Sequence, residues 1–369
     1  MNNTPIDPNF YAVIPAGGVG SRLWPLSRAD SPKFLLDFTG SGRSLLRETF
    51  DRVEHLVPAE RIVVVTGAHH ADAVAAQLPA LVEANLVAEP SPRESTAAIA
   101  LAAAILVNQN PDAIIGSFAA DHVIRNQAAF SLAVAEAVRL ASTGKVATIG
   151  IKPTSPSSAY GYIRVGSPLK EVSPQVASFE AEAFVEKPAL AIAQGYLETA
   201  NHLWNAGMFV LKAAVLLEIL SQTEPELASG VAAIAAAWNT DDREAVLARI
   251  WPTLRKIAID YSLAEPAADQ GLVAVVSADL DWTDVGDFAS MSTLHAADEL
   301  TAFGPATVVG LDSTGIVVSS GQKVIAVSGL TDVVIVETDD ALLVTTKQQA
   351  QSVKAVVAEL ERRGIRDVL

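Results

Sequence analysis

The sequence contains no cysteine and has far fewer basic than acidic residues. The absence of cysteine among 369 residues excludes disulfides and thiolate metal sites. Lys and Arg together number 26 against 42 Asp and Glu, a formal net charge of -16. Nucleic acids are bound by basic surfaces, so a nucleic-acid partner is excluded. A small anionic substrate would have to be bound by cations placed locally against this acidic background.

The sequence also lacks a run of apolar residues long enough to cross a bilayer. Its longest apolar run, residues 97–107, is Ala-rich and too short. The first ten residues are polar and contain proline, without the basic and apolar regions of a secretory signal. We therefore expect a cytoplasmic protein that does not bind membranes. Half of the residues are apolar, and the length allows one large α/β domain plus a smaller one.

Apolar runs alternate with helical patterns through the first 150 residues. The predicted strands and helices are, in order, 11–16, 44–55 (helix), 61–66, 70–78 (helix), 86–90, 95–108 (helix, with Ser95 or Thr96 as its N-cap), 113–118, 130–141 (helix) and 146–151. Continuously apolar strands separated by helices are typical of a mainly parallel sheet covered on both faces. Ligands of such sheets bind beyond the carboxyl ends of the strands.

The pattern changes after residue 153 and again after Gly304. The intermediate region predicts strands at 160–164, 183–188 and 272–276, a loop entering a strand at 204–210, and helices at 189–201, at 213–250 and after residue 288 to about 299. The last part predicts short strands at 307–309, 316–319, 323–327, 333–336 and 342–345, and a helix at 348–363. This spacing favours a β-solenoid or a small sandwich. We expect a boundary near 300, with domains at 1–299 and 300–369.

A glycine-rich stretch follows the first predicted strand. Three glycines, a serine and an arginine come directly after the apolar run 11–16. Free backbone N–H groups after a strand form an anion-binding nest, to which Arg22 and Lys33 add positive charge. We expect a polyphosphate ligand here, although a tight strand-to-helix turn is the alternative. Neither the dinucleotide fingerprint nor the Walker loop fits, so a dehydrogenase is excluded.

Acidic residues at two predicted strand ends are candidate metal ligands. Asp121 follows a buried strand, and Asp284 lies in a loop between Trp282 and Gly286. Mg²⁺ prefers few carboxylates, several waters and phosphate oxygens, so one Asp from each strand end suits a metal bound to a polyphosphate. The alternative for both is a turn aspartate. No sequence pattern of a covalent nucleophile is present, which favours direct displacement.

A polar group after another predicted strand suits a phosphorylated sugar. Glu186 and Lys187 are adjacent, so their side chains point in different directions. Glu186 could accept hydrogen bonds from hydroxyls while Lys187 binds a phosphate, and Asn205 could bind a further hydroxyl. The alternatives are an exposed strand end and a turn asparagine.

Residues 17–27, G-G-V-G-S-R-L-W-P-L-S, with Pro32 and Lys33 downstream, resemble the signature of the sugar nucleotidyltransferases. The ordered series A-D-H (120–122), G-Y-I (161–163), V-E-K-P (185–188), W-N-A-G-M-F (204–209), I-D-Y (259–261) and W-T-D-V-G-D (282–287) resembles the mannose-1-phosphate guanylyltransferases in particular. The resemblance extends over residues 11 to about 365. It implies a Rossmann-like, GT-A-like nucleotidyltransferase fold with a mixed, mainly parallel sheet and a C-terminal β-rich domain.

The resemblance also implies the reaction. GMP passes from GTP to mannose 1-phosphate, giving GDP-mannose and pyrophosphate, by Mg²⁺-dependent in-line attack of the sugar phosphate on the α-phosphorus. Such transfer requires positioning and charge neutralisation more than covalent chemistry. A homodimer is expected, because β-rich tails of this family often mediate self-association. The sequence ends without the isomerase domain of some longer relatives, so a bifunctional enzyme is not expected.

The resemblance assigns roles residue by residue. Arg22 would bind the leaving phosphates, Lys33 the triphosphate, Lys187 the attacking phosphate, and Asp121 with Asp284 the Mg²⁺. Gly161, Glu186 and Asn205 would bind mannose. The nucleotide would be bound by the loop residues Ala16, Gly17, Gly18, Gly20, Ser21 and Arg22, and by Glu89, Ser95 and Thr96.

Two alternatives stay open. A related enzyme using another nucleotide or sugar, such as glucose 1-phosphate with UTP or dTTP, would share the phosphate and metal residues. A non-catalytic regulatory subunit would be expected to lack Arg22, Lys33 or one of the two aspartates, and all four are present.

Overall fold

The computed structural model describes residues 7–169, 176–294 and 299–369, which divide into two compact units. Of the described residues, those within 7–17, 49–120 and 124–282 form the first unit, and those within 18–48, 121–123 and 283–369 form the second. The chain thus passes between the units after Gly17, in the middle of the glycine-rich stretch.

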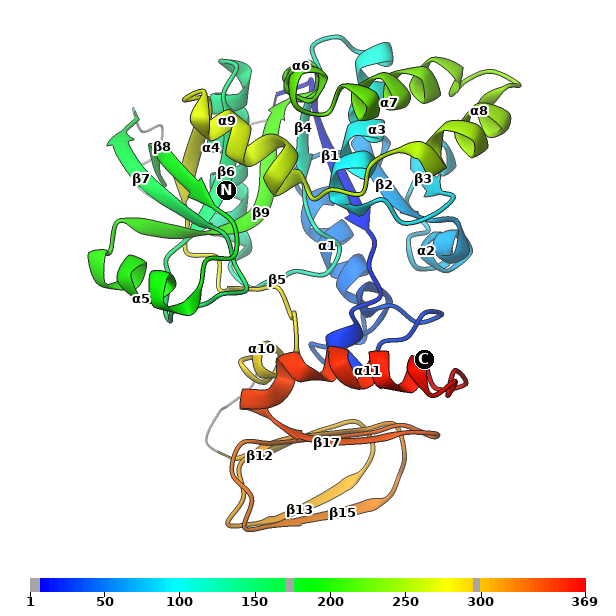
Figure 1. The fold of residues 1–369 in the computed structure, drawn as a ribbon, viewed down its shortest axis with the longest axis vertical. Coiled ribbons are helices and arrows are strands. Elements are labelled where there is room, and N and C mark those ends of the chain that lie inside the picture. Colours follow the sequence, from blue (N-terminus) through cyan, green and yellow to red (C-terminus); the bar gives the residue numbers. More distant parts are fainter. Residues whose placement is uncertain (1–6, 170–175, 295–298) are drawn as a thin grey trace. The chain divides into compact units, whose positions relative to one another are not determined.

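The first unit is built on a nine-stranded sheet in the order β3-β2-β1-β4-β9-β6-β10-β8-β7 (Figure 1). Its strands are β1 (Phe10–Ala16), β2 (Ile62–Gly67), β3 (Leu86–Glu89), β4 (Ile114–Ser117), β6 (Val146–Ile151), β7 (Tyr162–Pro168), β8 (Ala177–Val185), β9 (His202–Lys212) and β10 (Val273–Ser277). Strands β1 to β4 run parallel, as do β6 and β10. Strand β9 is antiparallel to both β4 and β6, and β8 is antiparallel to β7 and β10. The predicted mixed sheet is confirmed, with its antiparallel pairs gathered in one half.

Both faces of the parallel half are covered by helices. Val13, Val63 and Val65 face a core cluster with α3 (Glu94–Gln109), α6 (Ala213–Thr223) and α7 (Pro225–Ala237). Side chains alternate along a strand, so the neighbouring residues face the opposite side. There a Cβ on Gly116 would meet the rings of Phe10 and Phe118 at 2.8 Å, and Phe118 packs edge-on against Phe130 of α4 (Gln127–Ser142).

The remaining helices lie between or after these strands. They are α1 (Leu45–Glu54), α2 (Ala71–Gln77), α5 (Leu190–Thr199), α8 (Arg243–Ile250), α9 (Glu265–Asp269), α10 (Phe288–Ser292) and α11 (Val353–Arg362). Two short strands, β5 (Val123–Ile124) and β11 (Trp282–Thr283), pair with each other.

Some predicted elements differ from those observed. Helix α3 has Arg93 as its N-cap, so Ser95 and Thr96 lie within its first turn and do not cap it. Trp204 and Asn205 lie inside β9, because the segment pairs with β6 and β7, and they do not belong to a loop.

The predicted helix at 213–250 consists of α6, α7 and α8, since Pro225 starts α7 and a turn separates α7 from α8. Helix α10 ends at Ser292, well before 299, and residues 295–298 of that prediction lie outside the described chain. The terminal helix begins as a 3-10 segment, η8 (Lys347–Ser352), and continues as α11.

The C-terminal part of the second unit is a two-layered β-solenoid. One layer contains the parallel strands β12 (Leu300–Phe303), β14 (Gly315–Ser319) and β16 (Val333–Glu337), with β17 (Leu342–Thr346) antiparallel to β16. The other contains the parallel strands β13 (Thr307–Leu311) and β15 (Val324–Ser328). Figure 1 shows these two layers facing each other, with α11 running along the outer side of β17. Successive turns of the chain place corresponding strands side by side, so the predicted β-solenoid is confirmed.

Candidate active site

The glycine-rich loop has a backbone that only glycine adopts without strain at two positions. Gly18 has φ +84° and Gly20 has φ +77°, both in the left-handed region. A Cβ on Gly20 would lie 2.8 Å from Cβ of Lys33, whereas a Cβ on Gly17 or Gly18 would meet nothing within 4 Å. The Ser27 hydroxyl donates to the Gly20 carbonyl at 2.5 Å. Gly20 therefore serves the packing of the loop, while the backbone at Gly17 and Gly18 is open to a ligand.

Lys33 joins the two predicted metal ligands within the second unit. It is only 7% exposed and starts the short helix η2 (Lys33–Leu35). Its ammonium group lies 2.7 Å from a carboxylate oxygen of Asp121. The same group donates to the backbone carbonyls of Asp284, at 2.7 Å, and Val285, at 3.3 Å. The structure thus brings Lys33, Asp121 and the loop of Asp284 together.

The charges in this group favour an ionised Asp121. Burial by itself would raise the pKa of Asp121, but the positive charges of Lys33 and His122 and the hydrogen bond from Lys33 outweigh it, so the pKa is lowered. The Asp284 carboxylate accepts a hydrogen bond from the backbone N–H of Gly286 at 3.2 Å. Val285 between them has φ +45°, an uncommon conformation for a β-branched residue.

Arg22 is an exposed cation of the same unit. It lies in the short helix η1 (Ser21–Leu23), whose N-cap is Gly20. Arg22 makes no hydrogen bond or ion pair with the part of the chain that the structure describes, so its guanidinium is available to an anionic ligand. Leu23, the next residue, is fully buried and fixes the loop on the other side.

Asp121 and Asp284 are suitable ligands for a hard cation. Over residues 7–169, 176–294 and 299–369, no group of three or more His, Asp or Glu residues could hold a metal. Two carboxylates are nevertheless the set that Mg²⁺ needs when phosphate oxygens and water complete its octahedron.

A second polar group lies within the first unit, around Asn205. Asn205 is 7% exposed, and its side-chain oxygen accepts from the Thr148 hydroxyl at 3.0 Å and from the Gly207 backbone at 3.1 Å. Its amide donates to the Asp260 carboxylate at 2.9 Å. Its backbone N–H donates to the Gly161 carbonyl at 2.8 Å. Asn205 is thus held in one orientation by β6, β9 and the segment of Asp260.

Glu186 and Lys187 complete this group. The ammonium of Lys187 lies 2.5 Å from the carboxylate of Glu186, and the Lys187 side chain is 55% exposed whereas that of Glu186 is 6% exposed. The prediction that these two side chains point in different directions is therefore wrong, because Lys187 has φ +47° and the alternation of an extended strand does not apply there. A Cβ on Gly161 would meet the Glu186 carboxylate at 2.5 Å, so a side chain there would displace that carboxylate. Burial by itself lowers the pKa of Lys187, but the hydrogen bond and charge of Glu186 outweigh it and raise the pKa.

Asp260 is a site residue that the sequence analysis missed. Burial, and then the negative charge of Glu186, raises the pKa of Asp260 to about 6. The motif I-D-Y at 259–261 was a signal in the sequence, since an acid between an apolar residue and an aromatic one suggests a partly buried carboxylate. Asp260 lies 74 residues after Glu186 in the sequence, and no spacing rule links the two. Only the fold reveals that they are close together.

Ser95 and Thr96 support the segment that bears Asp260. The Ser95 hydroxyl accepts from the backbone N–H of Ile259 at 2.9 Å, and the Thr96 and Ser262 hydroxyls lie 2.8 Å apart. Glu89, at the end of β3, is partly buried, and burial raises its pKa to about 7. Ala16, at the end of β1, uses its carbonyl to accept from Thr66 at 2.8 Å. The nucleoside-binding roles of these residues stay predictions.

Comparison with known proteins defines the family. A sequence model of the family "Nucleotidyl transferase" matches residues 11–300, and one described as "MannoseP isomerase/GMP-like beta-helix domain" matches residues 306–360. The chain therefore belongs to the nucleotidyl transferase family and carries a C-terminal β-helix domain. Nucleotidyltransferases of this family typically use a divalent metal.

Relatives of named activity match over most of the chain. The mannose-1-phosphate guanylyltransferase of Escherichia coli strain K12 is 36% identical over 367 residues, which cover 96% of this chain and 74% of the relative. The xanthan biosynthesis protein XanB of Xanthomonas campestris pv. campestris is 37% identical over 358 residues, covering 95% and 73%. A crystal structure of mannose-1-phosphate geranyltransferase from Thermus thermophilus matches with a TM-score of 0.83 and 31% identity, covering 96% of this chain and 99% of that one.

The chain spans about three quarters of the length of these two sequence relatives. Among the described residues, no helix combines the length and apolar character needed to cross a membrane.

Proposed function

We propose that this nucleotidyltransferase transfers GMP from GTP to mannose 1-phosphate, releasing pyrophosphate and forming GDP-mannose. The observation that carries the proposal is the contact of Lys33 with Asp121 and with the loop of Asp284, in a chain 36% identical to a mannose-1-phosphate guanylyltransferase. These three residues supply the positive and negative groups that a metal-bound triphosphate requires.

On the nucleotide side, the open backbone at Gly17 and Gly18 would approach the phosphates, with Ser21 beside them. The exposed Arg22 would bind the departing pyrophosphate, and Lys33 would leave its carbonyl partners for a phosphate oxygen. Asp121 and Asp284 would hold Mg²⁺, which when bound neutralises phosphate charge and orients the α-phosphorus. Arg22 and Lys33 would neutralise the charge that develops on the leaving group.

On the sugar side, Glu186, Asn205 and the backbone of Gly161 would bind the mannose hydroxyls, and Lys187 would bind the attacking phosphate. The Lys187 side chain is the exposed member of the group, which suits a ligand that enters from solvent. Glu89, Ser95 and Thr96 are proposed to contact the nucleoside. The step is direct displacement: the sugar phosphate oxygen bonds to the α-phosphorus as the bond to pyrophosphate breaks.

The test is pyrophosphate release by the purified chain. GTP, UTP, dTTP and ATP would be assayed with mannose 1-phosphate and with glucose 1-phosphate, each with Mg²⁺ or with excess EDTA. We expect release with GTP and mannose 1-phosphate, and none with EDTA. Faster release with UTP or dTTP and glucose 1-phosphate would instead favour the related enzyme, and no release with any pair would favour a regulatory subunit.

Three further expectations belong to this proposal. The catalytic domain is proposed to span 1–299 and the C-terminal domain 300–369. A homodimer is expected, and a monomer mass at micromolar concentration would contradict it. The cytoplasmic location predicted from the sequence stays a prediction.

A further inference from the structure

Residues 24–27, W-P-L-S, belong to the signature and Arg28 follows them directly, but none of these residues has a role in the proposed chemistry. All of their contacts described below lie within the second unit. The indole N–H of Trp24 donates to the Val368 carbonyl at 2.7 Å. The Trp24 ring is 7% exposed and packs in a core cluster with Ile316, Val334 and Val353 of the β-solenoid and α11. The second half of the signature is therefore bound to the C-terminal domain.

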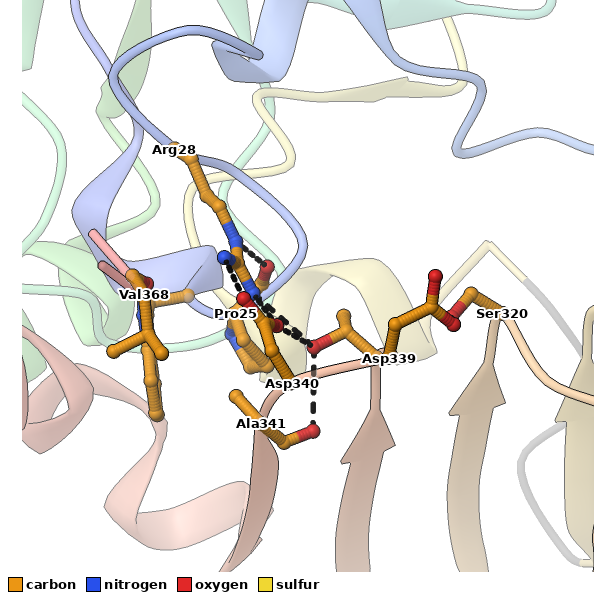
Figure 2. Close-up of polar contacts among 9 residues, drawn as sticks. Pro25, Arg28, Ser320, Asp339, Asp340, Ala341 and Val368 are labelled. Atoms are coloured by element: carbon orange, nitrogen blue, oxygen red, sulfur yellow. Dashed lines mark hydrogen bonds and ion pairs between the residues drawn. The ribbon is translucent and has the colours of Figure 1, made fainter.

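Arg28 makes the polar part of this attachment. Its guanidinium forms two hydrogen bonds with the Asp340 carboxylate, at 2.7 and 2.5 Å. It also donates to the Thr338 hydroxyl at 3.2 Å and to the Pro25 carbonyl at 3.1 Å. Figure 2 shows Arg28 extending from its loop toward Asp340, which lies in the turn between β16 and β17. The guanidinium thus makes one hydrogen bond within its own loop, to Pro25, and others to the solenoid, at Thr338 and Asp340.

The loop of Asp284 is attached to the same domain. Asp287 caps α10, accepting from the backbone N–H of Ser290 at 2.8 Å, and its other carboxylate oxygen accepts from the side-chain amide of Gln351 in η8. Val285 and Phe288 belong to the same core cluster as Trp24. The glycine-rich loop and the loop of Asp284 therefore both rest on the solenoid and its terminal helix.

We propose that the C-terminal β-solenoid is the scaffold that positions Arg22 and the glycine-rich loop, with Arg28 and Asp340 as positioning residues that latch the loop. This inference rests on the proposed function. Arg28 and Asp340 touch no substrate; they act through the loop.

The physical reason is the length of chain between fixed points. The Gly20 carbonyl accepts hydrogen bonds from the Ser27 hydroxyl and the Leu23 backbone N–H, and Leu23 and Trp24 are buried. Arg22 lies on the short exposed segment between them, so its direction depends on those anchors. When Arg28 is lost, the segment 24–28 loses its bidentate tie, and Arg22 samples more directions. An interaction aimed at the leaving phosphates then weakens, because misplacement of about 1 Å costs about 10²-fold in positioned reactions.

The latch is charged at any ordinary assay pH. The hydrogen bonds from Arg28 hold the pKa of Asp340 at about 2, below its ordinary value of 3.8. The effect of removing Arg28 should therefore be the same from about pH 6 to about pH 9, where both partners are fully ionised.

The experiment compares Arg28→Ala, Arg28→Lys and Asp340→Asn with a matched control, Arg362→Ala. Arg362 forms an equally bidentate pair with Glu359 on α11, and among the described residues that pair forms no hydrogen bond or ion pair with either loop. We expect Arg28→Ala to lower kcat/KM for GTP about tenfold or more, with KM for mannose 1-phosphate changed less than about twofold and a Tm close to that of the control. Arg28→Lys should recover part of the loss, because it keeps the charge while losing the bidentate geometry. Arg362→Ala should match the wild type.

A second readout, hydrogen exchange, does not depend on activity. Backbone amides of residues 18–27 should exchange at least about threefold faster in Arg28→Ala and Asp340→Asn than in wild type or Arg362→Ala. Unchanged exchange in this segment overturns the latch, whatever the activity. The latch is also overturned if GTP turnover falls while the Tm falls and the KM for mannose 1-phosphate rises to a similar extent. A general loss of folding would then explain the result. A wild-type chain that releases no pyrophosphate overturns the proposed function, while the exchange measurement still decides whether the solenoid orders the loop.

Discussion

Replacement of Lys33 by Met removes the charge at the centre of the candidate metal and phosphate group while keeping most of the aliphatic stem. The ammonium group has one carboxylate and two carbonyl partners. Removing one partner of a buried ion pair costs about 3–5 kcal/mol. The Asp121 side chain is 29% exposed, so solvent screens part of this, and we expect a loss of about 2–3 kcal/mol in the free energy of unfolding near neutral pH. Turnover should fall about 10²–10³-fold, the effect of removing a preorganised charge-stabilising donor.

The stability loss should depend on pH in a defined direction. In the wild type the pKa of Asp121 is lowered, so ionised Asp121 stabilises the fold above its unfolded pKa, and this stability is lost as pH falls through the folded pKa. In Lys33→Met, the charge and hydrogen bond that lowered the pKa of Asp121 are absent, so burial is no longer outweighed. The folded pKa of Asp121 then rises, and stability is lost as pH increases through it. The difference between wild type and variant should therefore grow from about pH 4 to about pH 7.

Urea unfolding at several pH values in EDTA, together with pyrophosphate release assays, checks both expectations. A stability difference that is constant over this pH range would show that the ion pair with Asp121 is not its source. Turnover close to that of the wild type would remove Lys33 from the nucleotide site.

Other substitutions test the remaining groups. Arg22→Ala should lower turnover about 10²–10³-fold with no shift in the urea midpoint, because Arg22 is exposed and has no partner in the described chain; an equal loss of stability would contradict this assignment. Asp284→Asn should lower turnover by orders of magnitude and raise the Mg²⁺ concentration needed for half-maximal activity, and an unchanged metal requirement would remove Asp284 from the metal site. For Asp260, whose pKa is raised to about 6, the wild type loses stability as pH rises from 3.8 through about 6, so Asp260→Asn should be more stable by about 1–3 kcal/mol at about pH 8 and equal to the wild type at about pH 4 by urea unfolding. The opposite trend with pH would show that Asp260 is stabilised as an anion.

The residue pattern alone was sufficient for features that depend on a short stretch of chain. The glycine-rich stretch after β1 needs left-handed backbone at Gly18 and Gly20, and glycine is the residue that adopts it without strain. The alternation of apolar runs and helical patterns was sufficient for the α/β class and for short strands after residue 300, but the choice of a β-solenoid over a small sandwich came from the parallel pairing of those strands. These features follow from backbone preference and from periodic burial, which act over a few residues.

Local pattern also misled at particular places. Ser95 and Thr96 are good capping residues, but their hydroxyls bind the segment 259–262 and the helix begins before them. Asn205 next to Gly207 looks like a turn, yet the pairing of β9 with its neighbours keeps it extended. In both cases contacts with distant segments outweighed local preference.

Only the tertiary structure decided which distant groups meet. Lys33 binds the Asp284 carbonyl across 251 residues of sequence, and Arg28 binds Asp340 across 312. Asp260 joins Asn205 in the same way. The sequence supplied each of these side chains with its charge and an approximate place at the end of an element. Which of them pair depends on how the helices and strands pack, because that packing brings together residues that are far apart in the sequence. No local spacing in the sequence specifies these contacts.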